Sequence, residues 1–178
     1  GDWHYTLRCD TDWFEEFEKT YQTGEKEQGY CVEQVGLLTM RKVIEEPYEI
    51  ELDYAEEGYL SMMGRTLKEG RYPAEEGEAA LDEFTLRNLD IPREIGTTFT
   101  LDGETFTLCG IVSEQPSALT QRMQVFVDPT RDYGTNGRFL YVKFEESKDI
   151  YRQMSAFADT FGISKKEIAA NWELVEWL

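Results

Sequence analysis

The stretch TTFTLDGETFTL, residues 97–108, constrains the fold more than any other part of the chain. Asp102-Gly103 is a preferred pair for the two-residue type I′ turn that joins antiparallel strands. With the turn centred there, Phe99 lies opposite Phe106, and such aromatic pairs stabilise neighbouring strands. The sequence therefore predicts a β-hairpin in the middle of the chain.

Other strands are predicted where apolar and polar residues alternate, or where a short apolar run is bounded by turn residues. In the strand around residues 49–54, the acidic residues should form a solvent-exposed face. The predicted strands are residues 3–9, 30–40, 49–54 with Glu49, Glu51 and Asp53 on the exposed face, 97–101, 104–112, 123–128 and 138–144. A loop with a turn at Asn136-Gly137 should separate the last two.

Helices are predicted where apolar residues recur three or four positions apart. Capping residues and glycines then suggest where each helix begins and ends. The predicted helices are one capped by Asp12 with Glu15 and ended by Gly24, one at 59–67, one capped by Ser147 that carries Ile150 to Phe161, and a last one from Ile168 to Leu178 behind a Ser164–Glu167 capping box. Because strands and helices mix without strict alternation, the fold class is α+β.

The composition is that of a globular chain with a very acidic surface. Of 178 residues, 40% are hydrophobic and 30% are charged, and 18 basic against 36 acidic residues give a net charge of −18. Such a surface repels phosphate backbones and anionic headgroups. We therefore expect no nucleic-acid partner. The sequence also contains no stretch of about 20 apolar residues that could cross a membrane.

The acidic stretch LKEGRYPAEEGEAALDEF, residues 67–84, resembles at first sight a carboxylate active site. Paired carboxylates act as acid and base in glycosidases. A catalytic pair has to be partly buried, whereas Glu75, Glu76 and Glu78 lie in a polar stretch flanked by glycine. A solvated acidic face is the better interpretation.

The remaining reactive residues suggest no catalytic, cofactor or metal site. His4 is the single histidine, sits on the polar face of its strand, and has no nucleophile motif beside it, so a surface or hydrogen-bonded role is expected. Asp10 and Asp12 lack the further ligands of a calcium loop. Cys9, Cys31 and Cys109 are interpreted as buried thiols, with one disulfide plus a spare thiol as the alternative.

Residues 67–116 resemble a known family. The segment LKEGRYPAEEGEAALDEFTLRNLDIPREIGTTFTLDGETFTLCGIVSEQP is similar to the extracytoplasmic core domain of MacB-type and FtsX-like ABC transporter permeases. The matching positions are Leu67, Gly70, Arg71, Pro73, Glu78, Gly96, Asp102, Gly103, Gly110 and Ile111. The link containing Pro92 is longer than in the family, and EAAL replaces bulkier residues. Arg71 is a candidate partner for Glu78, with a surface role for both as the alternative.

The resemblance implies a porter-like α+β subdomain, residues 1–63 with 138–178, and an inserted, mostly β subdomain, residues 64–137. In the first, residues 139–144 should pair with the strand at residues 3–9. The start of the chain would follow one transmembrane helix of the parent protein and its end would approach the next. We therefore expect both ends on the same side, with the first strand near the segment from Ile168.

The resemblance also implies a function. The domain would stand on the extracytoplasmic side of the cell membrane and pass ATP-driven conformational change to a substrate or a partner. Its partners would be a separate cytoplasmic ATPase and a second permease copy, and its substrate a peptide, a lipoprotein or another amphiphile. Two alternatives come from other classes: a free-standing acidic binding module, and a carboxylate-dependent hydrolase. We expect no enzymatic activity, no cofactor and a mostly monomeric isolated domain.

Overall fold

The structure is a computed structural model, and it describes residues 1–9, 13–115, 121–131, 133 and 137–175, with the backbone alone at 21–28, 57 and 173. The chain divides into two compact units. Unit 1 comprises Gly1–Leu38, Glu56–Met62 and Gly137–Leu178, and unit 2 comprises Thr39–Ala55 and Met63–Asn136.

Unit 1 is a small antiparallel sheet packed against two helices. The strand order is β10-β1-β9-β2, and β1 pairs antiparallel with both β9 and β10. The expected pairing of residues 139–144 with the first strand is therefore confirmed. The elements are β1 (Tyr5–Arg8), α1 (Trp13–Gln28), the first half of β2 (Val32–Ile44), α2 (Glu57–Met62), β9 (Gly137–Phe144), α4 (Ile150–Phe161), the 3-10 helix η2 (Lys165–Glu167), β10 (Ile168–Ala170) and α5 (Trp172–Val175).

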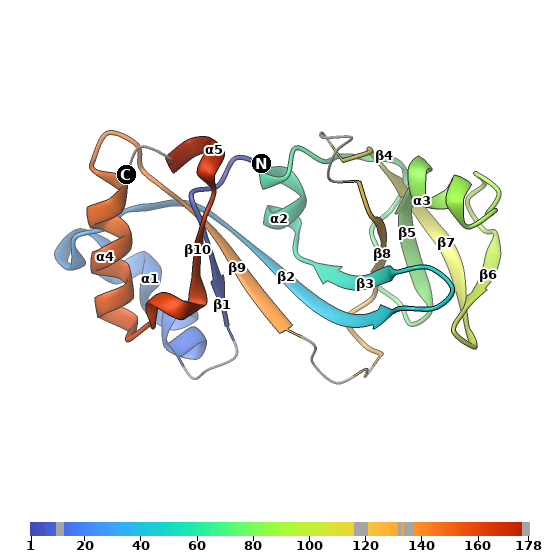
Figure 1. Cartoon of the computed structure of the whole chain (residues 1–178), viewed down its shortest axis with the longest axis horizontal. Coiled ribbons are helices and arrows are strands. Elements are labelled where there is room, and N and C mark those ends of the chain that lie inside the picture. Colours follow the sequence, from blue (N-terminus) through green and yellow to red (C-terminus); the bar gives the residue numbers. More distant parts are fainter. Residues whose placement is uncertain (10–12, 116–120, 132, 134–136, 176–178) are drawn as a thin grey trace. The chain divides into compact units, whose positions relative to one another are not determined.

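An aromatic cluster forms the core of unit 1, where α1 and α4 pack against each other (Figure 1). The Phe157 ring is fully buried, with its centroid 5.0 Å from that of Phe161, 5.5 Å from Phe17 and 5.2 Å from Tyr30. Edge-on and tilted aromatic pairs add to the stabilisation that burial alone provides. The helical spacing of these aromatic residues is therefore what holds α4 on the sheet.

Unit 2 is a mixed sheet. Its strand order is β2-β3-β8-β5-β7-β4, with β6 paired to β7. The β3–β8 and β5–β7 pairs are parallel, whereas β5–β8, β4–β7 and β6–β7 are antiparallel. The elements are the second half of β2, β3 (Ile50–Ala55), β4 (Leu67–Gly70), β5 (Glu78–Asp82), α3 (Glu83–Asn88), β6 (Thr98–Leu101), β7 (Glu104–Val112) and β8 (Met123–Val127).

The α+β class is confirmed, and so is the hairpin. Asp102 and Gly103 have φ of 47° and 79°, as a type I′ turn requires. Phe99 pairs with Phe106, and their ring centroids are 5.7 Å apart. The units differ from the expected subdomains in residues 39–55, which were assigned to the first and lie in unit 2 because β3 pairs with β8.

Two predicted helix ends are wrong because glycines elsewhere stop the helices. α1 passes through Gly24 to Gln28, and Gly29 has a φ of 87° just beyond its end. The helix predicted at 59–67 ends at Met62, and Gly64 has a φ of 69°. A positive φ, which glycine adopts without steric cost, turns the backbone out of the helix. Leu67 consequently lies in β4, opposite Val112.

Two predicted caps and the last predicted helix also need correction. Asp149, not Ser147, caps α4, because its carboxylate accepts from the Arg152 backbone N–H at 2.9 Å. Ser164 caps only the 3-10 turn η2. Residues 168–170 are then a strand because they complete the open edge of β1. Asp10, Asp12, Asn136 and the end from 176 to 178 fall outside the described residues.

Candidate functional site

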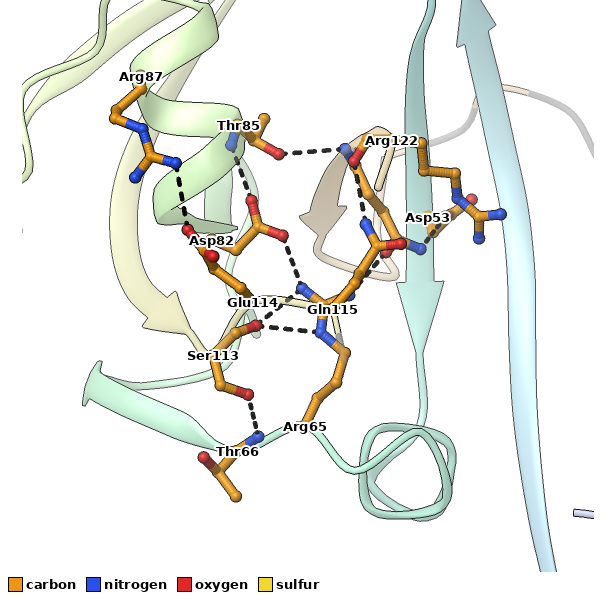
Figure 2. A network of polar contacts seen from close by, with 11 residues as sticks. Asp53, Arg65, Thr66, Asp82, Thr85, Arg87, Ser113, Glu114, Gln115 and Arg122 are labelled. Carbon is orange, nitrogen blue, oxygen red and sulfur yellow. Dashed lines mark hydrogen bonds and ion pairs between the residues drawn. The ribbon is translucent and has the colours of Figure 1, made fainter. Parts of the chain in front are cut away.

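A buried polar network in unit 2 is centred on Arg65, which follows α2 (Figure 2). The Arg65 side chain is 3% exposed. Arg65 Nη2 donates to Asp82 Oδ2 at 3.0 Å, and Nη1 donates to Gln124 Oε1 at 3.0 Å. Arg65 Nε also donates to the Ser113 carbonyl at 3.2 Å. The planar fork of an arginine suits several acceptors at once.

Asp82 joins this network to the start of α3. It is the last residue of β5, and its Oδ1 accepts from the Thr85 backbone N–H at 2.8 Å, which makes it the cap of the helix. Thr85 Oγ1 in turn accepts from the Gln124 backbone N–H at 3.4 Å. One carboxylate therefore neutralises the buried arginine and satisfies the helix terminus as well.

The other end of the network is Asp53 on β3, which is completely buried. Its Oδ2 accepts from Gln124 Nε2 at 2.6 Å, while Oδ1 is buried without a hydrogen-bond partner among the described residues. Burial first, and then the neighbouring Glu51 carboxyl, raise the pKa of Asp53 well above its ordinary value, and Gln124 and Arg122 oppose this shift. A proton on Asp53 would let Oδ1 act as a donor.

The sequence analysis missed this network and was wrong about Asp53. The alternating pattern of residues 49–54 predicted that this carboxylate faces solvent. In the structure β3 lies between β2 and β8, and Gln124 of β8 covers the Asp53 carboxyl. Parallel pairing is non-local, so no signal within residues 49–54 could have revealed it.

Glu78 and Arg71, two of the residues in the family motif, form an ion pair. The predicted solvated face is wrong for Glu78, which is buried. Arg71 is exposed, and Glu78 Oε1 accepts from Arg71 Nη1 at 2.7 Å. The same oxygen accepts from the backbone N–H groups of Ala74 at 3.1 Å and Glu75 at 2.6 Å. Burial raises the pKa of Glu78, but the bonds from Glu75, Arg71 and Ala74 outweigh it and leave the pKa lowered. Glu78 therefore holds the turn closed.

Gly70 and Gly110 face each other across the β4–β7 pair. A Cβ at Gly70 would collide with the Cys109 carbonyl, and one at Gly110 would collide with the Arg71 carbonyl. Arg71 N donates to Cys109 O at 2.9 Å at the same place. The backbones approach closely here because both residues lack a side chain.

The other motif residues lie in unit 2 but do not join one site. Pro73 is half-buried in the link between β4 and β5. Gly96 precedes β6, and its N–H donates to Leu108 O at 2.8 Å. Asp102 and Gly103 form the hairpin turn. The motif residues thus build turns and strand contacts.

His4 and the cysteines occupy structural positions. Of the two roles expected for His4, the structure shows the hydrogen-bonded one and not the surface one: the ring is buried, accepts from the Phe144 backbone N–H at Nδ1 and lies 3.2 Å from Glu146 through Nε2. The expected hydrogen bond is confirmed. Cys9 and Cys109 are buried and Cys31 is half-buried. Burial raises the pKa of the Cys109 thiol to about 11, which keeps it protonated.

The beginning and end of the described chain lie side by side in unit 1, as expected. Tyr5 of β1 is paired with Ala170 of β10. Asn171 then binds the first residues directly, because its Nδ2 donates to Gly1 O at 3.1 Å and to Trp3 O at 2.8 Å. The Asn171 backbone N–H also donates to His4 O at 2.9 Å. Residues 1–5 and residues 168–171 are therefore adjacent within unit 1.

Within the part of the chain that the structure describes, no cluster of three or more His, Cys, Asp or Glu side chains is arranged to hold a metal ion. In the same residues, no helix is both long and apolar enough to cross a membrane. The motif residues and the first and last described strands form turns, an ion pair and a strand pair. They position backbone segments.

The chain has the fold of the extracytoplasmic domain of MacB-type ABC transporter permeases. The chain is similar to the periplasmic region of MacB from Actinobacillus actinomycetemcomitans, with 15% identity and a TM-score of 0.54 over 97% of this chain and 90% of that one. It is also similar to the extracellular domain of the ABC-type transporter YknZ from Gram-positive bacteria, with 14% identity and a TM-score of 0.54 over 94% and 98% of the two chains.

At these identities the likeness establishes the fold. Comparisons with protein-family models and with curated protein sequences find no match to the chain.

Proposed function

We propose that this chain is the extracytoplasmic domain of an ABC transporter permease. It would relay the movement produced by a cytoplasmic ATPase to a substrate, such as a peptide, a lipoprotein or another amphiphile, or to a protein partner. A second permease copy would complete the transporter through the membrane region. The domain itself would carry out no catalysis.

The observation that carries the proposal is the pairing of β1 with β10, reinforced by Asn171. A domain inserted between two consecutive membrane helices must begin and end at the same side, and Asn171 binds both Gly1 and Trp3. The fold supports the same role, because the structural similarity to the periplasmic region of MacB extends over nearly all of both chains. The acidic charge of −18 is compatible with a domain held away from anionic headgroups.

Labelling of the full-length parent protein in intact cells tests the location. A cysteine introduced by Tyr48→Cys, where the tyrosine is 57% exposed, should react with a membrane-impermeant maleimide. The protein without the added cysteine measures the background from Cys9, Cys31 and Cys109. Labelling that occurs only after the cells are permeabilised would contradict an extracytoplasmic location.

Distance measurements on the reconstituted transporter test the relay of movement. One spin label in each unit, at exposed positions such as Tyr48 and Tyr151, reports the distance between them. We expect the distance distribution to change when ATP is hydrolysed and to stay unchanged with an ATPase subunit that cannot hydrolyse it. The same distribution in both conditions would count against the relay.

A further inference from the structure

The outer edge of β6 is open for pairing. Among the described strands, only β7 is paired with β6. Leu108 N donates to Thr97 O at 2.8 Å, and the register pairs Phe99 with Phe106. Because hydrogen-bonded pairs alternate along an antiparallel ladder, the backbone N–H and C=O groups of Thr98 and Thr100 point away from β7.

This edge lacks the usual protection against strand pairing. Edge strands are commonly guarded by lysine, proline or a bulge. β6 reads TFTL, its register with β7 is unbroken, and Thr98 and Thr100 are small and exposed. The outward backbone groups of both threonines are therefore accessible to another strand.

A groove of about 480 Å³ runs along the same edge. It is lined by β6, by the turn between β2 and β3, and by residues 88–92 at the end of α3 and just beyond it, all within unit 2. Buried Ile44, Ile50 and Ile91 belong to the core of unit 2, and half-buried Phe99 and Leu101 pack against it. The groove thus offers apolar contacts beside an open backbone edge.

The charged side chains that line the groove are all acidic: Glu46, Asp90 and Asp102. Asp102 is paired with Lys42, whose Nζ lies 2.7 Å from Asp102 Oδ2. Glu46 and Asp90 are exposed and have no ion pair within the described residues. The rim of the groove therefore carries negative charge that a basic ligand would neutralise.

We propose that β6 and this groove bind an extended segment of a partner polypeptide in which apolar residues alternate with Lys or Arg. The segment would add a strand to β6 through Thr98 and Thr100, and every second side chain would enter the groove. The intervening basic side chains would face solvent, and the negative charge of exposed Glu46 and Asp90 at the rim would attract them. This binding does not depend on the proposed membrane location, because the isolated chain should show it.

Peptide binding to the 178-residue chain tests the proposal. The probe is a fluorescein-labelled eight-residue peptide of alternating Lys and Val, followed by fluorescence anisotropy at physiological salt. A peptide with the same composition but all Lys before all Val is the control for simple charge attraction. We expect the alternating peptide alone to slow hydrogen exchange at the Thr98 and Thr100 amides. Equal binding of both peptides, without that protection, would overturn the proposal.

Two sets of variants locate the site. Thr100→Pro removes an outward N–H and leaves the bonds to β7 in place, so it should weaken binding about tenfold. Because this variant could unfold the hairpin, a second pair leaves the backbone unchanged. Glu46→Gln with Asp90→Asn should weaken binding about fivefold, whereas Glu75→Gln with Glu76→Gln, the same change in charge on exposed residues outside the groove, should not. Identical losses in the two double variants would also overturn it.

Discussion

Asp53 is an acid enclosed in unit 2, beside the second acid Glu51. Burial disfavours the charged form, and a nearby carboxylate disfavours it further. At pH values between the ordinary pKa and the raised one, the folded protein holds a proton that the unfolded chain releases. Stability from this group is greatest below the ordinary pKa of an aspartic acid and declines as the pH rises through the raised pKa of the folded state.

The Asp53→Asn variant should remove this decline. Its amide is neutral at every pH, can still accept from Gln124, and can donate where Asp53 needs a proton. As the pH rises above the ordinary pKa of an aspartic acid, the free energy of unfolding should fall less for the variant than for the unmodified protein. Urea unfolding at each pH measures this, with the exposed Asp90→Asn as control. Parallel pH profiles would mean that Asp53 is ionised in the folded state.

Arg65 is the buried cation of the network and forms an ion pair with buried Asp82. Arg65→Met leaves the buried carboxylate of Asp82 without its cation, which should lower the free energy of unfolding by about 3–5 kcal/mol. Arg87→Met is the matched control, because Arg87 is 63% exposed and lies 3.4 Å from Glu114, so its loss should cost less than about 1 kcal/mol. Similar denaturation midpoints for the two variants would contradict a buried, essential ion pair.

At the scale of elements, the close approach of β4 to β7 depends on two glycines. Gly110→Ala places a methyl group against the Arg71 carbonyl, which is backbone and cannot rotate away. We expect a loss of about 2–4 kcal/mol in stability. Gly103→Ala is the control, because a Cβ there meets nothing and only the positive φ is strained, at about 1 kcal/mol. Thermal unfolding of both variants decides whether crowding or backbone strain dominates.

The elements also show what sequence reasoning can reach. The Asp102-Gly103 hairpin was predicted because a two-residue turn and its aromatic pair are encoded locally. The strand at 168–170 was predicted as a helix, since its partner is β1 at the opposite end of the chain. The network of Asp53 and Arg65 was missed for the same reason. Interactions between distant segments leave no periodic pattern in either one.

At the scale of the whole molecule, the net charge of −18 should keep the isolated chain monomeric. Two such bodies repel each other over a Debye length of about 10 Å at moderate salt. Sedimentation velocity at several protein concentrations should therefore give one monomeric species. Exposed Trp172 and Leu174 are the apolar side chains most able to oppose this repulsion. A dimer that persists at high salt and without residues 165–178 would refute the prediction.

The pairing of β1 with β10 also determines how unit 1 would respond to mechanical load. Tyr5 is opposite Ala170 and Leu7 is opposite Ile168, so the two chain ends emerge at the same end of the antiparallel pair. A force that separates Gly1 from Asn171 would load the bonds of Asn171 to Gly1 and Trp3 before the bonds between β1 and β10. The hydrogen bonds of such a pair break one at a time, so the pair separates at lower force than two strands pulled in opposite directions along their length. The side-chain bonds of Asn171 would break before the bonds between β1 and β10.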